Sequence, residues 1–315
     1  MSNMLFEKTA FLRDNFEITS WQKYAFGKTI SHILKYHTQK MTAEYKLLDS
    51  GNGRKLERFG EFVTDRPCAQ AVWRTTLPRQ EWGRADAFFT REKNGGWSFR
   101  RQMPREWHCQ LGGITFIVSP TDFGHMGVFP EHLIGWRWMT ERVKEASRPH
   151  PSVLNLFAYS GGATLALAKA GCELCHLDAS KKTVDWAHRN AAANNLQDAP
   201  IRWIVDDVNK FLQRELRRGR KYDGILLDPP SFGRGTNQEV FKIDDGLLAL
   251  LDNCRQLLSD EPLFLFLTCH TPGYTPIVLG HLVRQVFGKG HIETGEMFIE
   301  SQLALPSGSF AAWRP

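Results

Sequence analysis

The second half of the chain, from Val153 onward, alternates short, mostly apolar runs with longer amphipathic segments. Short apolar runs are typical of strands buried on both faces, whereas apolar residues three or four positions apart predict helices. The pattern predicts strands at residues 153–157, 173–178, 201–205, 223–228 and 263–268, and helices at 162–170, 181–194, 208–218, 244–258 and 277–287. A strand pair near 291–305 follows. This alternation favours an α/β fold with a doubly wound, mostly parallel sheet.

The first half has a different texture, with short apolar pieces separated by Gly, Pro and charged residues from Tyr45 to Val118. Such spacing is typical of a small β-rich domain. A helical pattern begins at Pro130 and stops before Pro149, and we expect this helix to join the domains. Residues before Tyr45 form either a helix or an arm. We therefore predict a β-rich domain at residues 1–118 and an α/β domain at 119–315.

Composition makes the chain an ordinary globular protein, because 42% of its residues are hydrophobic and 23% are charged. The net charge of +6 is unevenly distributed. Residues 1–150 contain 23 Lys and Arg against 16 Asp and Glu, whereas residues 151–315 contain 17 against 18. A basic module favours a polyanionic partner such as RNA, although many proteins with a pI near 9 bind none. The aromatic and basic segment Trp97–Arg101 either stacks on bases or belongs to the domain core.

The chain has no segment typical of export or membrane insertion. Met1–Ile30 lacks the apolar core of a signal peptide, and no apolar run is long enough to cross a bilayer. We expect a cytoplasmic protein with its six cysteines reduced. Cys172 and Cys175 form a CxxC pair without a second pair at zinc spacing, so packing is the default interpretation and a metal or redox role the alternative. No metal is predicted.

A glycine turn follows the first strand of the α/β region, in the sequence Ala158-Tyr159-Ser160-Gly161-Gly162. Gly161 and Gly162 leave room for a ligand to approach the backbone, and the helix that follows directs its N-terminal amides toward the site. The dinucleotide fingerprint GxGxxG and the phosphate-loop sequence GK[ST] are both absent. The turn therefore predicts a nucleotide-type pocket that is neither a typical dehydrogenase site nor an ATPase site.

Acidic residues end the next three strands. Asp178 is positioned to accept hydrogen bonds from the two ribose hydroxyls of an adenosine, or else to cap the following helix. Asp207 follows the third strand, where it can bind an adenine amino group, and we expect one member of the Asp206–Asp207 pair to be a helix cap. Asp228 precedes Pro229 and Pro230, whose rings fix an extended turn without amide donors and direct the carboxylate toward a planar polar substrate, or form a purely structural turn.

Together, these motifs resemble those of class I S-adenosylmethionine-dependent methyltransferases. The resemblance rests on Asn155–Gly161, Asp178–Ser180, Asn190–Asn195, Asp207 and Asp228–Gly233, with Gly124–Glu131 similar to the segment that precedes the first cofactor motif. The nearest group is similar to bacterial 23S ribosomal RNA cytosine-C5 methyltransferase I. The resemblance implies S-adenosyl-L-methionine as cofactor and an RNA substrate, ribosomal RNA above all.

The resemblance also implies roles for individual residues. Phe157, Tyr159 and Gly161 would line the methionine end of the cofactor. The rest of the cofactor would lie against Asp178 and Ala179 at the ribose, Asp207 at the adenine, and Asp228 with Pro229 at the border of the substrate site. Pro230 and Phe232 would contact the substrate base.

Cytosine C5 becomes nucleophilic only after a thiolate attacks C6, and Cys269 at the end of the strand at 263–268 is the candidate nucleophile. Asp228 would then hold cytosine N3. His270 would help to lower the pKa of the thiol. The alternative for Cys269 is a small buried residue at the end of a sheet. The sequence Thr-Cys-His-Thr-Pro departs from the serine-flanked cysteine of the resembling group.

Three functions remain compatible with the sequence. The first is an RNA base methyltransferase whose basic N-terminal domain contacts phosphates. The second is a small-molecule or protein methyltransferase with the same cofactor site. The third is a catalytically inactive RNA-binding protein with a degenerate pocket. The sequence does not indicate an oligomeric state.

Overall fold

The computed structural model describes residues 44–92, 95–234 and 240–315. The helix or arm predicted before Tyr45 therefore lies outside the described residues. Two larger sheets and two hairpins account for the strands of the described part. Among these residues, no helix combines the length and apolar character needed to cross a bilayer.

The larger sheet has seven strands in the order β10-β9-β8-β11-β14-β16-β15. β8 pairs in parallel with β9 and β11, β9 with β10, and β11 with β14, whereas β16 runs antiparallel to both β14 and β15. The strands are β8 (Ser152–Leu156), β9 (Glu173–Asp178), β10 (Ile201–Val205), β11 (Gly224–Leu227), β14 (Phe264–Cys269), β15 (His291–Ile299) and β16 (Leu305–Arg314). The predicted doubly wound, mostly parallel α/β sheet is confirmed.

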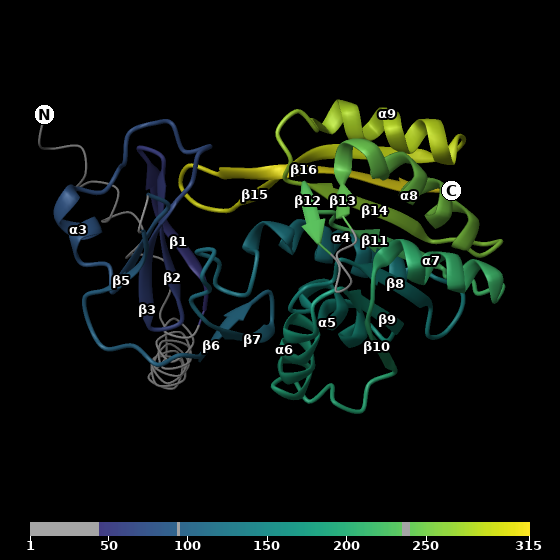
Figure 1. Ribbon diagram of the computed structural model, residues 1–315, viewed down its shortest axis with the longest axis horizontal. Coiled ribbons are helices and arrows are strands. Elements are labelled where there is room, and N and C mark those ends of the chain that lie inside the picture. Colours follow the sequence, from purple (N-terminus) through teal and green to yellow (C-terminus); the bar gives the residue numbers. More distant parts are fainter. Residues whose placement is uncertain (1–43, 93–94, 235–239) are drawn as a thin grey trace, which may run out of the picture. The chain divides into compact units, whose positions relative to one another are not determined.

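Helices cover both faces of this sheet (Figure 1). One face packs on α7 (Val208–Arg217), α8 (Ile243–Leu257) and α9 (Pro276–Phe287), and the other on α4 (Leu133–Lys144), α5 (Gly162–Lys169) and α6 (Lys181–Ala192). Apolar side chains that alternate along β14 separate the two cores, because Leu265 and Leu267 join the first cluster while Phe264 and Phe266 join the second. Burial on both faces explains the continuous apolar sequences Ile225–Leu227 in β11 and Phe264–Leu267 in β14.

The chain reverses its direction across the sheet between β8 and β11. From β8 it proceeds outward to β9 and β10, then returns to the opposite side of β8 as β11. The loops after β8 and β11 consequently diverge above neighbouring strands and leave a crevice at their carboxyl ends. The fold thus brings the glycine turn after Leu156 next to Asp228, although Gly162 and Asp228 are 66 positions apart in sequence.

The first half forms a five-stranded sheet in the order β1-β2-β3-β4-β5, and its strands carry the purple and blue colours in Figure 1. The strands are β1 (Lys46–Gly51), β2 (Arg54–Phe59), β3 (Phe62–Pro67), β4 (Ala87–Thr90) and β5 (Gly96–Phe99), with α3 (Arg79–Gly83) between β3 and β4. A hairpin of β6 (Trp107–Leu111) and β7 (Ile114–Val118) follows, and η1 (Pro130–His132) precedes α4. The hairpin shares a hydrophobic cluster with α4 and α5. The boundary between residues 118 and 119 stays a prediction.

Two features differ from the sequence prediction. The last strand begins at Leu305 and continues to Arg314, whereas the sequence pattern placed the end of the strand pair near 305. Phe310 and Ala312 face one core while Ala311 and Trp313 face the other. The strand therefore lacks the alternation of apolar and polar residues by which a strand with one exposed face is recognised in sequence. A short hairpin of β12 (Phe232–Arg234) and β13 (Val240–Lys242) was also not predicted.

Candidate cofactor and acceptor cleft

A cleft of about 540 Å³ lies at the carboxyl ends of the parallel strands. Its volume is within the range typical of small-molecule sites. Its lining comes from the segment before α4 and from the loops after β8, β9, β10, β11 and β14; it comprises His125, Phe129, Phe157, Tyr159, Leu177, Asp178, Ala179, Ser180, Asp206, Asp207, Val208, Asp228, Pro229, Pro230, Ser231, Gly233, Phe241 and His270. Most residues predicted to form the site thus lie around one cavity.

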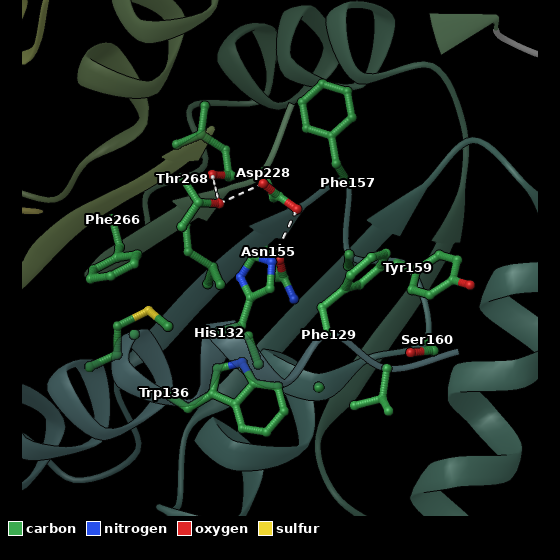
Figure 2. Close-up of a pocket in the computed structure, with 18 residues that line it drawn as sticks. Phe129, His132, Trp136, Asn155, Phe157, Tyr159, Ser160, Asp228, Phe266 and Thr268 are labelled. Carbon is green, nitrogen blue, oxygen red and sulfur yellow. Dashed lines mark hydrogen bonds and ion pairs between the residues drawn. The ribbon is translucent and has the colours of Figure 1, made fainter. Parts of the chain in front are cut away.

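A smaller cavity of about 80 Å³ adjoins the cleft and shares Phe129, Phe157, Tyr159 and Asp228 with it. It reaches the N-terminal end of α5 at Gly162 and Ala163. Figure 2 shows His132 and Trp136 along one wall of this cavity, with Asp228 and Thr268 above them. The N-terminal end of α5 therefore lies at the smaller cavity rather than along the main cleft.

The turn after β8 adopts an unusual backbone conformation. Phe157, Tyr159 and Gly161 have φ angles of 57°, 49° and 89°. Left-handed backbone is uncommon for bulky residues, and such strain concentrates at functional sites. The Tyr159 amide donates a 2.9 Å hydrogen bond to Asp178 Oδ2, which ties the turn to the end of β9. Gly161 lines neither cavity and contributes its backbone conformation instead.

Asp178 organises the ribose side of the cleft. Besides the bond from Tyr159, its Oδ1 atom accepts 2.9 Å hydrogen bonds from the Ser180 amide and the Thr183 hydroxyl. Ser180 caps α6 by accepting a bond from the Thr183 amide, so the capping alternative for Asp178 is wrong. A carboxylate offers about four acceptor positions, and these three bonds leave capacity on Oδ2.

Asp206 and Asp207, the acid pair after β10, have different hydrogen-bond partners. Asp207 is the cap of α7, since its Oδ1 atom accepts a 3.0 Å bond from the Lys210 amide. Asp206 pairs with Arg214 and accepts a bond from the Asp207 amide. Both aspartates line the cleft. Asp207, the predicted adenine ligand, is thus the member of the pair that caps the helix.

At the end of β11, Asp228 faces three polar side chains. Its Oδ1 atom accepts a 2.6 Å hydrogen bond from the Thr268 hydroxyl. His132 Nε2 lies 3.5 Å from Oδ2, and His270 Nε2 lies 3.8 Å from Oδ1. The dashed lines in Figure 2 join Asp228 to both Thr268 and His132. The two prolines after Asp228 also line the cleft, and the role of this turn in binding stays a prediction.

The charge of the cleft is informative about its ligand. Four aspartates and two histidines line it, and its described lining contains neither Lys nor Arg. Diphosphates are normally held by cationic side chains or amide-rich loops, whereas a ligand with positive charge is favoured beside carboxylates. The lining therefore suits the sulfonium of S-adenosylmethionine better than a dinucleotide or a nucleoside triphosphate.

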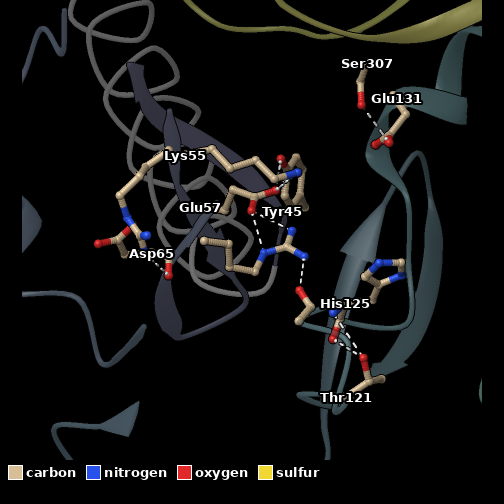
Figure 3. A network of polar contacts seen from close by, with 11 residues as sticks. Tyr45, Lys55, Glu57, Asp65, Thr121, His125, Glu131 and Ser307 are labelled. Carbon is tan, nitrogen blue, oxygen red and sulfur yellow. Dashed lines mark hydrogen bonds and ion pairs between the residues drawn. The ribbon is translucent and has the colours of Figure 1, made fainter. Parts of the chain in front are cut away.

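A buried polar network links the five-stranded sheet to this cleft (Figure 3). Arg66 donates to Glu57 Oε2 at 2.8 and 2.5 Å through Nε and Nη2, and through Nη1 to the Gly124 carbonyl at 2.9 Å. Thr121 and His125 close the adjacent loop with reciprocal hydrogen bonds. Burial, followed by the charges of Arg66, Arg91 and Lys55, lowers the pKa of His125 to about 4, so its ring is neutral at neutral pH.

Cys269 and Phe232 are absent from the described lining of both cavities. Cys269 is 1% exposed and packs in the cluster formed with α7, α8 and α9. Burial raises the pKa of its thiol, and the Thr271 amide donates to its sulfur at 3.4 Å. Phe232 is 51% exposed on β12. Both substrate-side roles stay predictions.

Several lining residues were not predicted from the sequence. Phe129, His132, Phe241 and His125 come from segments without a strand-end acid or a glycine turn. Phe129 lies 5.4 Å from Tyr159 and Phe241 lies 5.4 Å from Phe157, measured between ring centroids. In the sequence, the segment around His125 and Phe129 is marked only by its similarity to a family motif. Its position at the cleft depends on tertiary packing.

The CxxC pair does not form a site. Cys172 and Cys175 belong to hydrophobic clusters on opposite faces of the sheet. Burial raises the pKa of Cys172 to about 12 and that of Cys175 to about 11. The packing interpretation is confirmed for both cysteines.

A doubly wound sheet with an acid-rich, aromatic cleft at its switch point defines an α/β protein that binds a nucleoside-type ligand. Comparisons identify the family. Residues 93–261, more than half of the chain, match the family described as S-adenosylmethionine-dependent methyltransferase. The chain belongs to this family, which confirms the predicted enzyme class and methyl donor.

The solved structure of the SAM-dependent methyltransferase from Agrobacterium tumefaciens is 42% identical, with a TM-score of 0.83 over 86% of this chain and 90% of that one. Among curated relatives, ribosomal RNA large subunit methyltransferase K/L of Syntrophotalea carbinolica is 33% identical over 154 residues, which are 48% of this chain and 20% of the relative. Ribosomal RNA large subunit methyltransferase I of Shigella flexneri is 30% identical over 206 residues, which are 63% of this chain and 47% of the relative. The chain thus spans less than half the length of these two curated relatives.

Proposed function

We propose that this protein transfers a methyl group from S-adenosylmethionine to a base in RNA, with ribosomal RNA as the favoured substrate. The observation that carries this proposal is the contrast between an acid-rich, aromatic cleft and a basic first half of the chain. A flat, uncharged base fits the cleft, while the phosphates of the same nucleic acid are attracted to the basic surroundings. The names of the two curated relatives agree with an RNA substrate.

For the cofactor, we propose that Asp178 and Ala179 hold the ribose and Asp207 the adenine amino group. Phe157 and Tyr159 would enclose the methionine end. The amides at the start of α5 would attract the carboxylate of the methionine moiety. S-adenosylmethionine supplies an electrophilic methyl group on a cationic sulfur, so the protein has mainly to position donor and acceptor. Carboxylates around the cleft favour this cationic ligand.

For the acceptor base, we propose that Asp228, Pro229 and Pro230 form the edge against which the ring lies. Phe129 presents an aromatic face on the other side of the shared space, and Tyr159 packs beside it. Planar rings in such surroundings gain stacking energy with little dependence on base identity. Asp228 would accept a hydrogen bond from the polar edge of the base. Phe232, half exposed on the β12–β13 hairpin, would contact a neighbouring part of the RNA.

For the RNA backbone, we propose that the N-terminal domain, residues 1–118, provides the contacts, while 119–315 carries the methyltransferase site. Phe99, in this domain, is 53% exposed, and Phe123, just beyond its boundary, is 78% exposed. Arg91 belongs to the group of cations whose charges act on His125 at the edge of the cleft. Exposed aromatic rings beside cations are typical of single-stranded RNA surfaces. Such a substrate agrees with a cytoplasmic location, which we include in the proposal.

The finer hypothesis is methylation of cytosine C5 through a covalent bond to Cys269. A thiolate nucleophile requires a lowered pKa and access to the substrate. The raised pKa and 1% exposure of Cys269 argue against both conditions and favour its interpretation as a packing residue. We therefore propose base methylation without assigning the bond to Cys269, and treat the C5 chemistry as a hypothesis for direct test.

The decisive experiment offers tritiated S-adenosylmethionine and purified protein to RNA, protein and metabolite fractions from cells that lack the gene. Incorporation into ribosomal RNA is the expected result. Incorporation only into protein or small molecules would overturn the RNA assignment in favour of another methyl acceptor. Absence of cofactor binding in calorimetry would leave a catalytically inactive RNA-binding protein.

A second measurement tests the basic surface separately. Arg91→Gln should weaken RNA binding and reduce the slope of log affinity against log salt by about 0.7 to 0.9 for each phosphate that the protein no longer neutralises. Affinity for S-adenosylhomocysteine should stay unchanged. An unaltered salt slope would remove Arg91 from the proposed RNA surface.

A further inference from the structure

Three side chains that are distant in sequence converge where the two cavities meet. His132 comes from η1, Asp228 follows β11 and His270 follows β14. One potential ligand atom from each of the three lies within 4.8 Å of the others. The shortest separations are 3.3 Å between the two Nε2 atoms, 3.5 Å from His132 Nε2 to Asp228 Oδ2, and 3.8 Å from His270 Nε2 to Asp228 Oδ1.

From this geometry, we propose that His132, Asp228 and His270 bind a divalent transition-metal ion of the zinc class at the acceptor end of the cleft. Two imidazoles and one carboxylate are a ligand set that such ions favour. Ligands about 2.0 to 2.1 Å from a tetrahedral zinc ion stand about 3.3 to 3.4 Å apart. The separations of His132 Nε2 from His270 Nε2 and from Asp228 Oδ2 are both close to that value. The 3.8 Å distance from His270 is to the other carboxylate oxygen, Oδ1, so His270 has to move toward Oδ2 to complete the set.

Direct hydrogen bonding explains the cluster less well. The separations of 3.5 and 3.8 Å between Asp228 and the histidines are longer than normal hydrogen bonds. The two histidines lie within hydrogen-bonding distance of each other, with 3.3 Å between their Nε2 atoms. Asp228 stands apart from both rings, an arrangement that a cation between the three groups would satisfy.

The surroundings hold two of the three ligands in position. The Thr268 hydroxyl binds Asp228 Oδ1 and leaves Oδ2 directed toward His132. Gly308, with φ of +105°, lies so close that a Cβ atom there would stand 2.9 Å from His270 Nδ1. Glycine at this position therefore leaves room for the Nδ1 side of the His270 ring. The Thr268–Asp228 bond is the kind of outer contact that orients metal ligands in known sites.

The coordination would be incomplete, because the described residues contribute three ligands to this group. Three protein ligands with an open fourth position are typical of catalytic rather than structural zinc sites. Asp228 and His270 line the main cleft, while Asp228 and His132 line the smaller cavity. The open position would therefore receive an oxygen or nitrogen atom of the methyl acceptor. The inference does not depend on the RNA assignment.

The test uses full-length protein treated with a chelator and then titrated with Zn²⁺ by calorimetry. One equivalent of Zn²⁺ should bind per chain. His270→Gln and His132→Gln should each weaken binding by more than the about 10- to 100-fold typical of losing an outer-shell partner. His281→Gln, at an exposed position on α9, is the matched control and should keep native affinity.

Substitution with Co²⁺ separates this site from the cysteines. Nitrogen and oxygen ligands should give visible cobalt bands without the near-ultraviolet sulfur-to-cobalt transition that thiolates produce. His270→Gln, whose native side chain is 36% exposed, provides the variant least prone to unfold. Absence of saturable Zn²⁺ binding, equal affinity in His270→Gln and native protein, or a thiolate spectrum would each overturn the proposal.

Discussion

The Thr268 hydroxyl donates a 2.6 Å hydrogen bond to Asp228 Oδ1 and thereby selects the carboxylate oxygen that faces His132. Thr268 is buried, with 3% of its surface exposed, whereas Asp228 borders both cavities. Thr268 lines the smaller cavity but not the main cleft. Its hydroxyl therefore positions a residue at the proposed boundary between cofactor and acceptor from the side of the smaller cavity.

Replacing Thr268 with Val should reduce methyl transfer because the Asp228 carboxylate loses its orienting donor. Hydrogen bonds to charged groups contribute about 1.5 to 3 kcal/mol, which corresponds to a decrease of about 10- to 100-fold if the bond acts fully in the transition state. Affinity for S-adenosylhomocysteine should change little. Tritiated methyl transfer and calorimetry measure the two quantities.

Thr140→Val is the control for this substitution, because the Thr140 hydroxyl bonds only to carbonyls of its own helix, α4. Turnover in Thr140→Val should stay near the native value. If Thr268→Val also retains native turnover, the orientation of Asp228 does not limit the reaction.

Asp178→Asn should weaken cofactor binding. The carboxylate accepts bonds from two backbone amides and one hydroxyl, and the amide nitrogen of Asn would oppose at least one of these donors. Loss of one charge-assisted bond alone predicts about a tenfold increase in the Kd of S-adenosylhomocysteine. Isothermal calorimetry gives the value. Asp198→Asn, at an exposed residue bonded only to Gln197, should leave it unchanged.

The conformation of the glycine turn can be tested with a matched pair. Gly161 and Gly171 have φ angles of +89° and +92°, but a Cβ atom on Gly161 would stand 3.1 Å from Ala187 Cβ whereas one on Gly171 meets nothing within 4 Å. Both alanine variants should lose about 1 to 2 kcal/mol of stability from left-handed backbone. Only Gly161→Ala should also lose cofactor affinity, since it displaces the turn that carries Tyr159. Equal cofactor affinity in the two variants would remove this packing contact from the site.

The sequence predicted the α/β half closely because its signals are local. Strands buried on both faces, such as β11 with Ile225–Leu227, have continuous apolar sequences, and Asp228 directly follows this strand. Asp178 is the last residue of the more mixed strand β9. The carboxyl ends of parallel strands lie at the same edge of a sheet. Acids at the ends of neighbouring strands are therefore brought to one cleft.

The acceptor end could not be predicted in the same way. His132 and His270 are 138 residues apart, and their approach depends on tertiary packing, in which η1 contacts β15. The choice between Asp206 and Asp207 as cap depends on side-chain rotamers. The burial of Cys269 depends on which face of β14 it occupies, and its flanking sequence gives no sign of that.

Cys269→Ser distinguishes the two interpretations of this cysteine. Because the thiol is buried and its pKa is raised, we expect turnover to stay within about threefold of native. RNA containing 5-fluorocytosine should then form no covalent adduct. Abolished turnover with unchanged cofactor affinity, together with a trapped adduct on gel electrophoresis, would establish the C5 mechanism and reverse our interpretation.

His176 predicts a dependence of stability on pH. Burial in β9, where the ring is 0% exposed, lowers its pKa to about 3 from the ordinary value of 6.5. The unfolded chain therefore binds a proton below about pH 6.5 that the folded chain rejects, so the contribution of His176 is complete above that pH and is lost as the pH falls toward 3. The free energy of unfolding should decrease by about 1 kcal/mol per pH unit on this account.

Urea unfolding at pH 7.5, 6 and 5 should show a shallower decrease for His176→Gln than for the native protein, while exposed His281→Gln follows the native curve. Parallel curves for native protein and His176→Gln would mean that this ring does not titrate differently in the folded and unfolded states.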